Sequence, residues 1–237
     1  MWKKIFTPEG GGKPKKREDI SSWDVIVLSF SLLFQNIQFW IRPNIWMVLI
    51  SIPLVTLPGA KAGLYQAVSV GLCDPALTYA DPRQEMKKGF FKFVWRALGL
   101  ELLKWFVLAV ILTSIWFWIA QDTWVLRSIS VISIYGFILW WTTIGYIYPV
   151  LIEKPDLNIY QVAKEAAILA FRKPFDSLLF AVISTLLFIL GLILLGPILF
   201  IIPALRSILH IQGYWFVNGQ IIPGFMDIVE YTEKYYD

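Results

Sequence analysis

The chain has 237 residues, of which 57% are hydrophobic and 16% charged, and its formal net charge is +4. This balance excludes an ordinary soluble globular protein, in which about a quarter of the residues are charged. One cysteine and one histidine exclude an internal disulfide and a Cys/His metal cluster, and we expect no cofactor. The surplus of Lys and Arg is typical of the cytoplasmic loops of a membrane protein, so we expect no nucleic-acid partner.

Apolar runs of membrane-spanning length recur along the chain. A helix needs about 20 residues to cross ~30 Å of hydrocarbon. The sequence therefore predicts an all-α fold, a polytopic helical membrane protein with five or six membrane-crossing helices, in one membrane domain of residues 23–222. The expected crossings are residues 23–41, 44–72, 97–119, 124–152, 177–196 and a weaker segment at 198–222.

Two polar tails flank this domain. Residues 1–22 contain three consecutive glycines followed by a cluster of basic residues, which predicts a flexible basic tail. Residues 223–237 are polar and acidic. The apolar run starts only near Trp23 and has no small-x-small cleavage site at its end, so we do not interpret the N-terminus as a signal peptide.

The first expected crossing is short and polar at one end. Gln35, Asn36 and Gln38 crowd the end of residues 23–41, so this segment either crosses the membrane or lies in its interface. Arg42 and Pro43 come next, and we expect the helix to break there.

The second expected crossing contains a break of its own, in "SIPLVTLPGAKAGLYQAV" at residues 51–68. Proline removes a backbone donor, a hydroxyl can bond a freed carbonyl, and small residues allow a second helix to approach. These properties predict a helix break and packing site at Pro53, Thr56, Pro58, Gly59 and Ala62.

A lysine follows this break. Lys61 is expected to reach the cytoplasmic interface by snorkelling, which makes Glu101, at the start of the next long crossing, a possible ion-pair partner. Lys104 lies three residues after Glu101 on the same helical face and is a second candidate partner.

Residues 73–96 form the first substantial polar segment. Asp81 followed by Pro82 is a typical helix start. An apolar face then recurs at helical spacing, and basic residues occupy the other side, which predicts a short amphipathic helix on the cytoplasmic membrane surface. The apolar positions are Met86, Phe90, Phe93 and Ala97; the basic residues expected to contact anionic lipid headgroups or a partner are Lys87, Lys88, Lys92 and Arg96.

Residues 153–176 form a second polar segment. Asp156 is expected to cap a helix that Pro174 ends, and Arg172 and Lys173 are further candidates for lipid or partner contacts. One side of this helix is predicted to combine Leu157, Tyr160, Lys164, Ile168 and Phe171.

The distribution of charge predicts the orientation. If both of the first two segments cross, the basic segments 1–19, 73–96 and 153–176 fall on one side and "AQDT" at 120–123 falls on the other. We therefore expect a multi-pass protein of the plasma membrane with a cytoplasmic N-terminus, in which residues 97–152 form an antiparallel hairpin.

Sequence motifs give little indication of catalysis. No metalloprotease, nucleophile-elbow or paired-acid pattern is present, so we expect no enzymatic activity. His210 is interpreted as an interfacial histidine near Arg206, and Cys73 as a small apolar residue at a helix end. Residues 165–167, "EAA", look like the coupling loop of ATP-driven importer permeases, but Phe171 stands where that motif has glycine.

Residues 44–68 carry a more extensive resemblance. Asn44, Pro53, Thr56, Gly59, Ala60, Ala62, Leu64 and Tyr65 match the pattern of the YesL-like family of bacterial integral membrane proteins. "MKKGFFKFVWRALGLELLKW" at 86–105, "YIYPVL" at 146–151 and "AKEAAILAFRKP" at 163–174 are also similar to that family. The resemblance covers most of residues 25–220, and Pro58 and Lys61 depart from it.

The resemblance implies an accessory role. YesL-like proteins are commonly encoded beside sugar importers and have no established biochemical activity. The chain is therefore expected to be a non-enzymatic accessory or assembly subunit linked to carbohydrate uptake, bound to the bilayer and to another membrane protein. The alternative is a small-solute transporter or an importer permease-like subunit that uses the helix break as its binding site.

Overall fold

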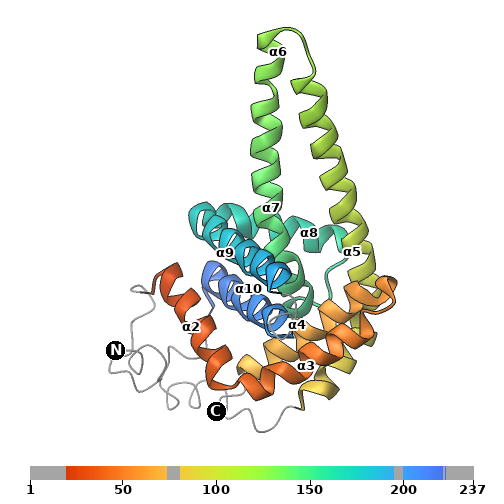
Figure 1. Cartoon of the computed structure of the whole chain (residues 1–237), viewed down its shortest axis with the longest axis vertical. Coiled ribbons are helices and arrows are strands. Elements are labelled where there is room, and N and C mark those ends of the chain that lie inside the picture. The colour runs from red at the N-terminus through yellow and green to blue at the C-terminus, as the bar shows by residue number, and fades with distance from the viewer. Residues whose placement is uncertain (1–19, 74–80, 195–199, 221, 223–237) are drawn as a thin grey trace.

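The computed structural model describes residues 20–73, 81–194, 200–220 and 222, and every regular element in these ranges is helical (Figure 1). The expected tails, 1–22 and 223–237, fall almost wholly outside the described residues. The elements are α2 (Ser22–Gln35), α3 (Ile37–Ile50), the 3₁₀ turn η2 (Leu54–Thr56), α4 (Leu57–Cys73), α5 (Pro82–Ile119), α6 (Trp124–Ser128), α7 (Ser130–Glu153), α8 (Ile159–Arg172), α9 (Pro174–Ile193) and α10 (Ile202–Asn218).

The helices form a packed body from which a two-helix hairpin extends (Figure 1). Its arms are the C-terminal part of α5 and the N-terminal part of α7, with α6 at the far end. The turn at residues 120–123 connects them, so the predicted antiparallel hairpin is present. The body contains α2, α3, α4, α8, α9 and α10 with the base of the hairpin, which we call the helical body.

Fewer helices are long and apolar enough to cross a membrane than the five or six expected. Among the described residues three helices qualify, namely α5, the α6–α7 segment and α9, and a fourth is obtained if the bent pair α2–α3 counts as one crossing. The chain is thus a helical protein with apolar segments suited to a membrane. The expected crossings at 44–72 and 198–222 are not among the qualifying helices of the described ranges.

The first break lies earlier than predicted. The chain turns by 90° between α2 and α3, at Asn36, whereas Pro43 lies inside α3. The prediction of a break at Arg42 and Pro43 was therefore wrong. Inside the helix Pro43 removes one backbone hydrogen bond, but its ring is buried, so packing against the other helices holds it in place.

The second expected crossing is two helices. α3 ends at Ile50 and α4 begins at Leu57, with η2 between them. Neither Pro58 nor Gly59 lies in the break, because both belong to the first turn of α4. Pro58 suits this place, since the first helical turn does not need its missing N–H.

The amphipathic surface helix expected within residues 73–96, at 85–96, is not a separate helix. It is the N-terminal part of α5, which continues for 38 residues into the hairpin. Its start was predicted correctly, because the Asp81 side chain accepts a hydrogen bond from the Arg83 N–H at 3.0 Å. The predicted apolar face packs inward, with Met86, Phe93 and Ala97 fully buried.

α8 differs from the prediction in its cap. Asn158, not Asp156, is the N-cap, and its side chain forms a reciprocal capping box with Gln161. Pro174 follows the end of α8 as expected and also opens α9. The buried positions are Val162, Ala166, Leu169 and Ala170, whereas Tyr160, Ile168 and Phe171, assigned to one side by the sequence, are exposed.

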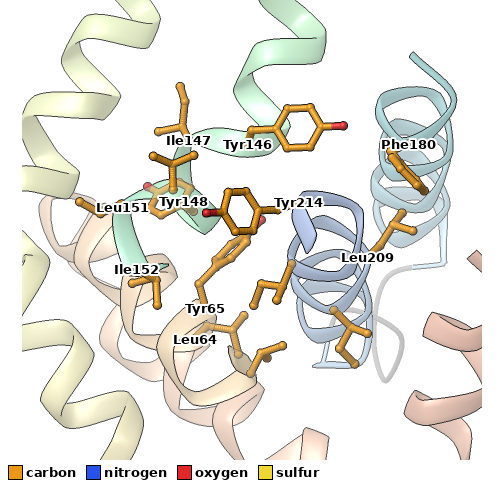
Figure 2. Close-up of a cluster of buried hydrophobic side chains, with 14 of the residues drawn as sticks. Leu64, Tyr65, Tyr146, Ile147, Tyr148, Leu151, Ile152, Phe180, Leu209 and Tyr214 are labelled. Atoms are coloured by element: carbon orange, nitrogen blue, oxygen red, sulfur yellow. The ribbon is translucent and has the colours of Figure 1, made fainter. Parts of the chain in front are cut away.

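α10 forms the centre of the core rather than a weak crossing. Almost every side chain from Ala204 to Trp215 is buried, and the helix packs against α2, α4, α7 and α9. The Ser29 hydroxyl of α2 donates to Gln212 Oε1 at 2.6 Å, which links the first described helix to the last. Side chains of α4, α7, α9 and α10 meet in the cluster that Figure 2 shows.

Candidate functional site

Close packing of α4 on α5 sets the position of the charged residues. A Cβ on Gly63 would lie 2.6 Å from the Met86 carbonyl oxygen, and one on Gly89 would lie 2.5 Å from Gln66 Cβ. Only glycine allows the two helices to approach this closely. The contact brings Lys61 of α4 beside Glu101 of α5.

Glu101 is held by three donors from three helices. Its Oε1 atom accepts from Lys61 Nζ at 3.0 Å and from the Tyr148 hydroxyl at 2.8 Å, and its Oε2 atom accepts from Lys104 Nζ at 2.9 Å. The Glu101 side chain is 11% exposed and that of Lys104 15%, but that of Lys61 is 32% exposed. The structure therefore brings together both of the ion pairs that the sequence suggested.

Two stacked tyrosines connect Glu101 to a second group of polar contacts on α9 and α10. The Tyr65 and Tyr148 rings stack at 5.1 Å between centroids, and Figure 2 shows them side by side. The Tyr65 hydroxyl lies 2.5 Å from His210 Nδ1, and His210 Nε2 lies 2.8 Å from Ser184 Oγ. Arg206 Nε donates to the same hydroxyl at 2.9 Å.

We call this set the polar network. It links five helices, α4, α5, α7, α9 and α10. Its members are Lys61, Tyr65, Glu101, Lys104, Tyr148, Ser184, Arg206 and His210. Hydrogen bonds between buried polar groups of different helices restrict how these helices can be arranged.

The network carries more positive than negative charge. It contains one carboxylate, Glu101, and three cations, Lys61, Lys104 and Arg206. Within the described ranges, no carboxylate forms an ion pair with Arg206. The Arg206 guanidinium instead lies 5.1 Å from the ring centre of Phe188.

A small cavity adjoins the network where α7, α9 and α10 meet. His210, Thr142, Tyr146 and Ser177 supply its polar lining, and the Tyr146 hydroxyl donates to Ser177 Oγ at 2.8 Å. Its two glycines, Gly145 and Gly213, reduce the side-chain volume at this point.

The helix break is satisfied by its own residues. The Thr56 hydroxyl bonds the carbonyl of Pro53 at 2.7 Å and also contacts that of Ile50, so these two carbonyls at the break have a partner. A Cβ on Gly59 would lie 2.9 Å from Phe90, and Ala62 is fully buried. The break thus provides packing and internal hydrogen bonds.

The basic residues expected at the membrane surface divide into two groups. Lys87, Lys88 and Lys92 are exposed on α5. The other three make contacts within the protein. Arg96 donates to the carbonyls of Pro155 and Leu157, and Arg172 donates to Asn218 Oδ1 at 3.0 Å. The Lys173 ammonium lies 3.8 Å from the ring centre of Phe216.

Sequence reasoning missed the roles of Tyr65, Tyr148, Ser184 and Arg206 in a common network. Their helices are distant in the sequence, so helical periodicity could not bring them together. The sequence predicts an interfacial His210 near Arg206. Both side chains contact the Ser184 hydroxyl, as this proximity requires, but His210 is buried rather than interfacial. Cys73 lies at a helix end, as expected, because it is the last residue of α4, and it is exposed.

No group of acidic, histidine or cysteine side chains suited to a metal ion occurs among the residues that the structure describes. Comparison of the chain with protein-family models, with curated proteins and with solved structures finds no match.

Proposed function

We propose that the protein is a non-enzymatic integral membrane accessory subunit that binds a transmembrane helix of another membrane protein through its α5–α7 hairpin. The proposal includes a location in the bacterial plasma membrane with a cytoplasmic N-terminus. Because the sequence resembles YesL-like proteins, a carbohydrate importer is the partner that we propose.

The uncovered surface of the hairpin is the observation that carries this proposal. No residue in the most apolar stretch of α5 is fully buried by the rest of the protein. Leu102, Trp105, Phe106 and Trp116 all point large apolar side chains outward from α5, and Ile132 does so from α7. A surface of this kind is stable in hydrocarbon or against an apolar partner, but not in water.

The length and polarity of the hairpin suit a bilayer. From Leu102 to Ala120 the helix rises about 27 Å at ~1.5 Å per residue, close to the ~30 Å of a hydrocarbon core. Exposed tryptophans occur toward both ends, at Trp105 and Trp124, as in the aromatic belts of membrane proteins. The polar turn after Ile119 caps the far end.

Small residues on α7 favour a helical partner. A Cβ on Gly136 would meet nothing within 4 Å, so the backbone is open to close approach by another helix. In membranes, such positions promote helix association because packing replaces the hydrophobic effect as the driving force. Small side chains also meet between the two arms of the hairpin, where the hydroxyl oxygens of Ser133 and Ser114 lie 2.8 Å apart.

Site-specific photocrosslinking in native membranes tests the proposal. A benzophenone amino acid at Ile132, on the hairpin, is expected to crosslink one membrane protein reproducibly, which mass spectrometry identifies. The same probe at Phe175, an equally apolar and exposed residue of the helical body, is the matched control and is expected to give no such product. Recovery of the chain alone from both positions, with no co-purifying protein in mild detergent, would contradict the proposal.

The polar network favours one alternative, a small-solute transporter or permease-like subunit. Transporters commonly place polar groups and broken helices at membrane depth, and here His210 lines a cavity beside the network. Reconstituted vesicles distinguish the two: uptake of oligosaccharides or other small solutes that is lost in His210→Ala supports transport, and absence of uptake with the crosslinked partner present rules it out.

A further inference from the structure

Arg206 is the network cation whose charge is least compensated. Nε donates to Ser184 Oγ, and in the part of the chain that the structure describes no other hydrogen bond from the guanidinium is found. Guanidinium has five N–H donors arranged as a planar fork. Most of these N–H donors therefore remain available to a ligand, although the side chain is only partly exposed.

The surrounding charges make an anion favourable at this place. Arg206 and Lys61 both lie within electrostatic range of the Lys104 ammonium and repel it, and Glu101 is the one carboxylate that the network contributes. Partly buried charges are costly unless they are paired. An anion at Arg206 would offset this surplus.

The surface next to Arg206 is apolar. Its guanidinium lies over Phe188 of α9, a helix long and apolar enough to cross a membrane. Phe188, Ile189 and Leu192 are all exposed on this helix. A ligand that joins a phosphate to hydrocarbon chains would match both the cation and its apolar surroundings.

From these observations we propose that Arg206 binds a phosphate oxyanion, held bidentately by its guanidinium, in the headgroup of an anionic phospholipid whose acyl chains lie along α9. Ser184 orients the guanidinium through Nε, and Phe188 supports its face. Lys61 and Lys104 add positive potential without touching the phosphate. The site is independent of the partner that the hairpin binds.

Lipid titrations of the delipidated full-length protein in dodecyl maltoside test this site. Phosphatidylglycerol is expected to raise the midpoint of thermal unfolding and to remain bound in native mass spectrometry. Phosphatidylcholine, which has no net negative charge, is expected to do neither. Inorganic phosphate distinguishes the source of the oxyanion: an equal effect of phosphate alone would identify a soluble anion, and no effect would identify the lipid.

Variants locate the site. Arg206→Gln is expected to lower phosphatidylglycerol retention at least tenfold, and Arg206→Lys to keep part of it, since charge remains while the bidentate fork is lost. Arg83→Gln is the matched control, because Arg83 also lies over an aromatic ring, that of Trp46, but is exposed and outside the network. Retention in Arg83→Gln should equal that of the wild type.

An equal effect of inorganic phosphate alone would overturn the assignment to a lipid, and two further results would overturn the whole inference. One is wild-type protein on which neither phosphatidylglycerol nor phosphate has an effect. The other is an Arg206→Lys or Arg206→Gln variant that retains phosphatidylglycerol as well as Arg83→Gln does. If Arg206→Gln does not fold, Arg206→Lys and the wild-type titrations decide the question on their own.

Discussion

At the level of single residues, Glu101 joins the helical body to the base of the hairpin. Its carboxylate receives hydrogen bonds from α4, from its own helix α5 and from α7. Removal of this one acceptor leaves Lys61 and Lys104 facing each other without a counter-charge. The loss of the Glu101 carboxylate should therefore lower the free energy of unfolding more than the loss of a typical surface ion pair.

We expect Glu101→Ala to lower the free energy of unfolding by about 3–5 kcal/mol, the cost of breaking a largely buried ion pair on one side. Thermal unfolding in detergent micelles measures the effect. Glu85→Ala, which breaks a surface pair with the exposed Lys88, serves as control and should cost under about 1 kcal/mol. Similar losses in the two variants would show that the Glu101 contacts are energetically ordinary.

The sequence predicted the pairing of Lys61 and Glu101 because both residues were expected at the same membrane interface. Tyr148 could not be anticipated in this way. It comes from a helix whose rotation about its axis depends on packing against α5, and an apolar helix gives little indication of which face turns inward. Arg206 and His210 were expected near each other because they lie one helical turn apart.

At the level of elements, the contact between α4 and α5 depends on glycine. We expect Gly63→Ala to destabilise the protein by about 1–3 kcal/mol, because the added methyl would overlap the Met86 carbonyl and push the helices apart. Gly136→Ala is the matched control. Its Cβ has open space, so the helix should gain about 0.5–1 kcal/mol.

Measurement of the unfolding midpoints of both glycine variants in the same detergent checks this prediction. If Gly63→Ala is as stable as Gly136→Ala, the close approach of α4 and α5 is incorrect.

The cap of α8 gives a second prediction at this level. Asn158→Ala should lower the free energy of unfolding by about 1 kcal/mol, because the Gln161 N–H loses its acceptor. Asp156→Ala should have little effect, since Asp156 is exposed and lies before the capping box. Circular dichroism during thermal unfolding compares the two, and a larger loss in Asp156→Ala would restore the cap that the sequence favoured.

Local rules predicted some elements well and others poorly. Asp81 and Pro82 set the start of α5, and Pro174 marks the end of α8, because capping and proline geometry act within a few residues. The Pro43 prediction failed because tertiary packing buries this proline in α3. Nor did the pattern of 85–96 show that its helix would continue unbroken into the hairpin.

At the level of the whole molecule, the two ends of the hairpin are expected on opposite sides of the membrane. In a Cys73→Ser background, Asp122→Cys at the tip and Lys154→Cys at the base of α7 should react with a membrane-impermeant maleimide from opposite faces. Labelling of intact cells and of inverted vesicles measures this. Modification of both positions from one face would place the whole hairpin outside the bilayer.

The number of crossings was the least predictable feature. Hydropathy marked α5, α7 and α9 correctly as apolar helices of sufficient length. It also marked α4 and α10, whose apolar side chains are buried by the other helices of the protein. Composition alone does not distinguish an apolar helix that faces lipid from one that faces its own core.

The central position of α10 has a consequence for biosynthesis. Because α10 is the last described helix, the ribosome completes α2, α4, α7 and α9 before the helix against which they pack exists. Ser29 of α2 can therefore bond Gln212 only after nearly the whole chain has been synthesised. Until then the nascent protein exposes unfilled core surfaces, so premature termination near residue 200 should yield a product that quality-control proteases remove rather than a partly functional one.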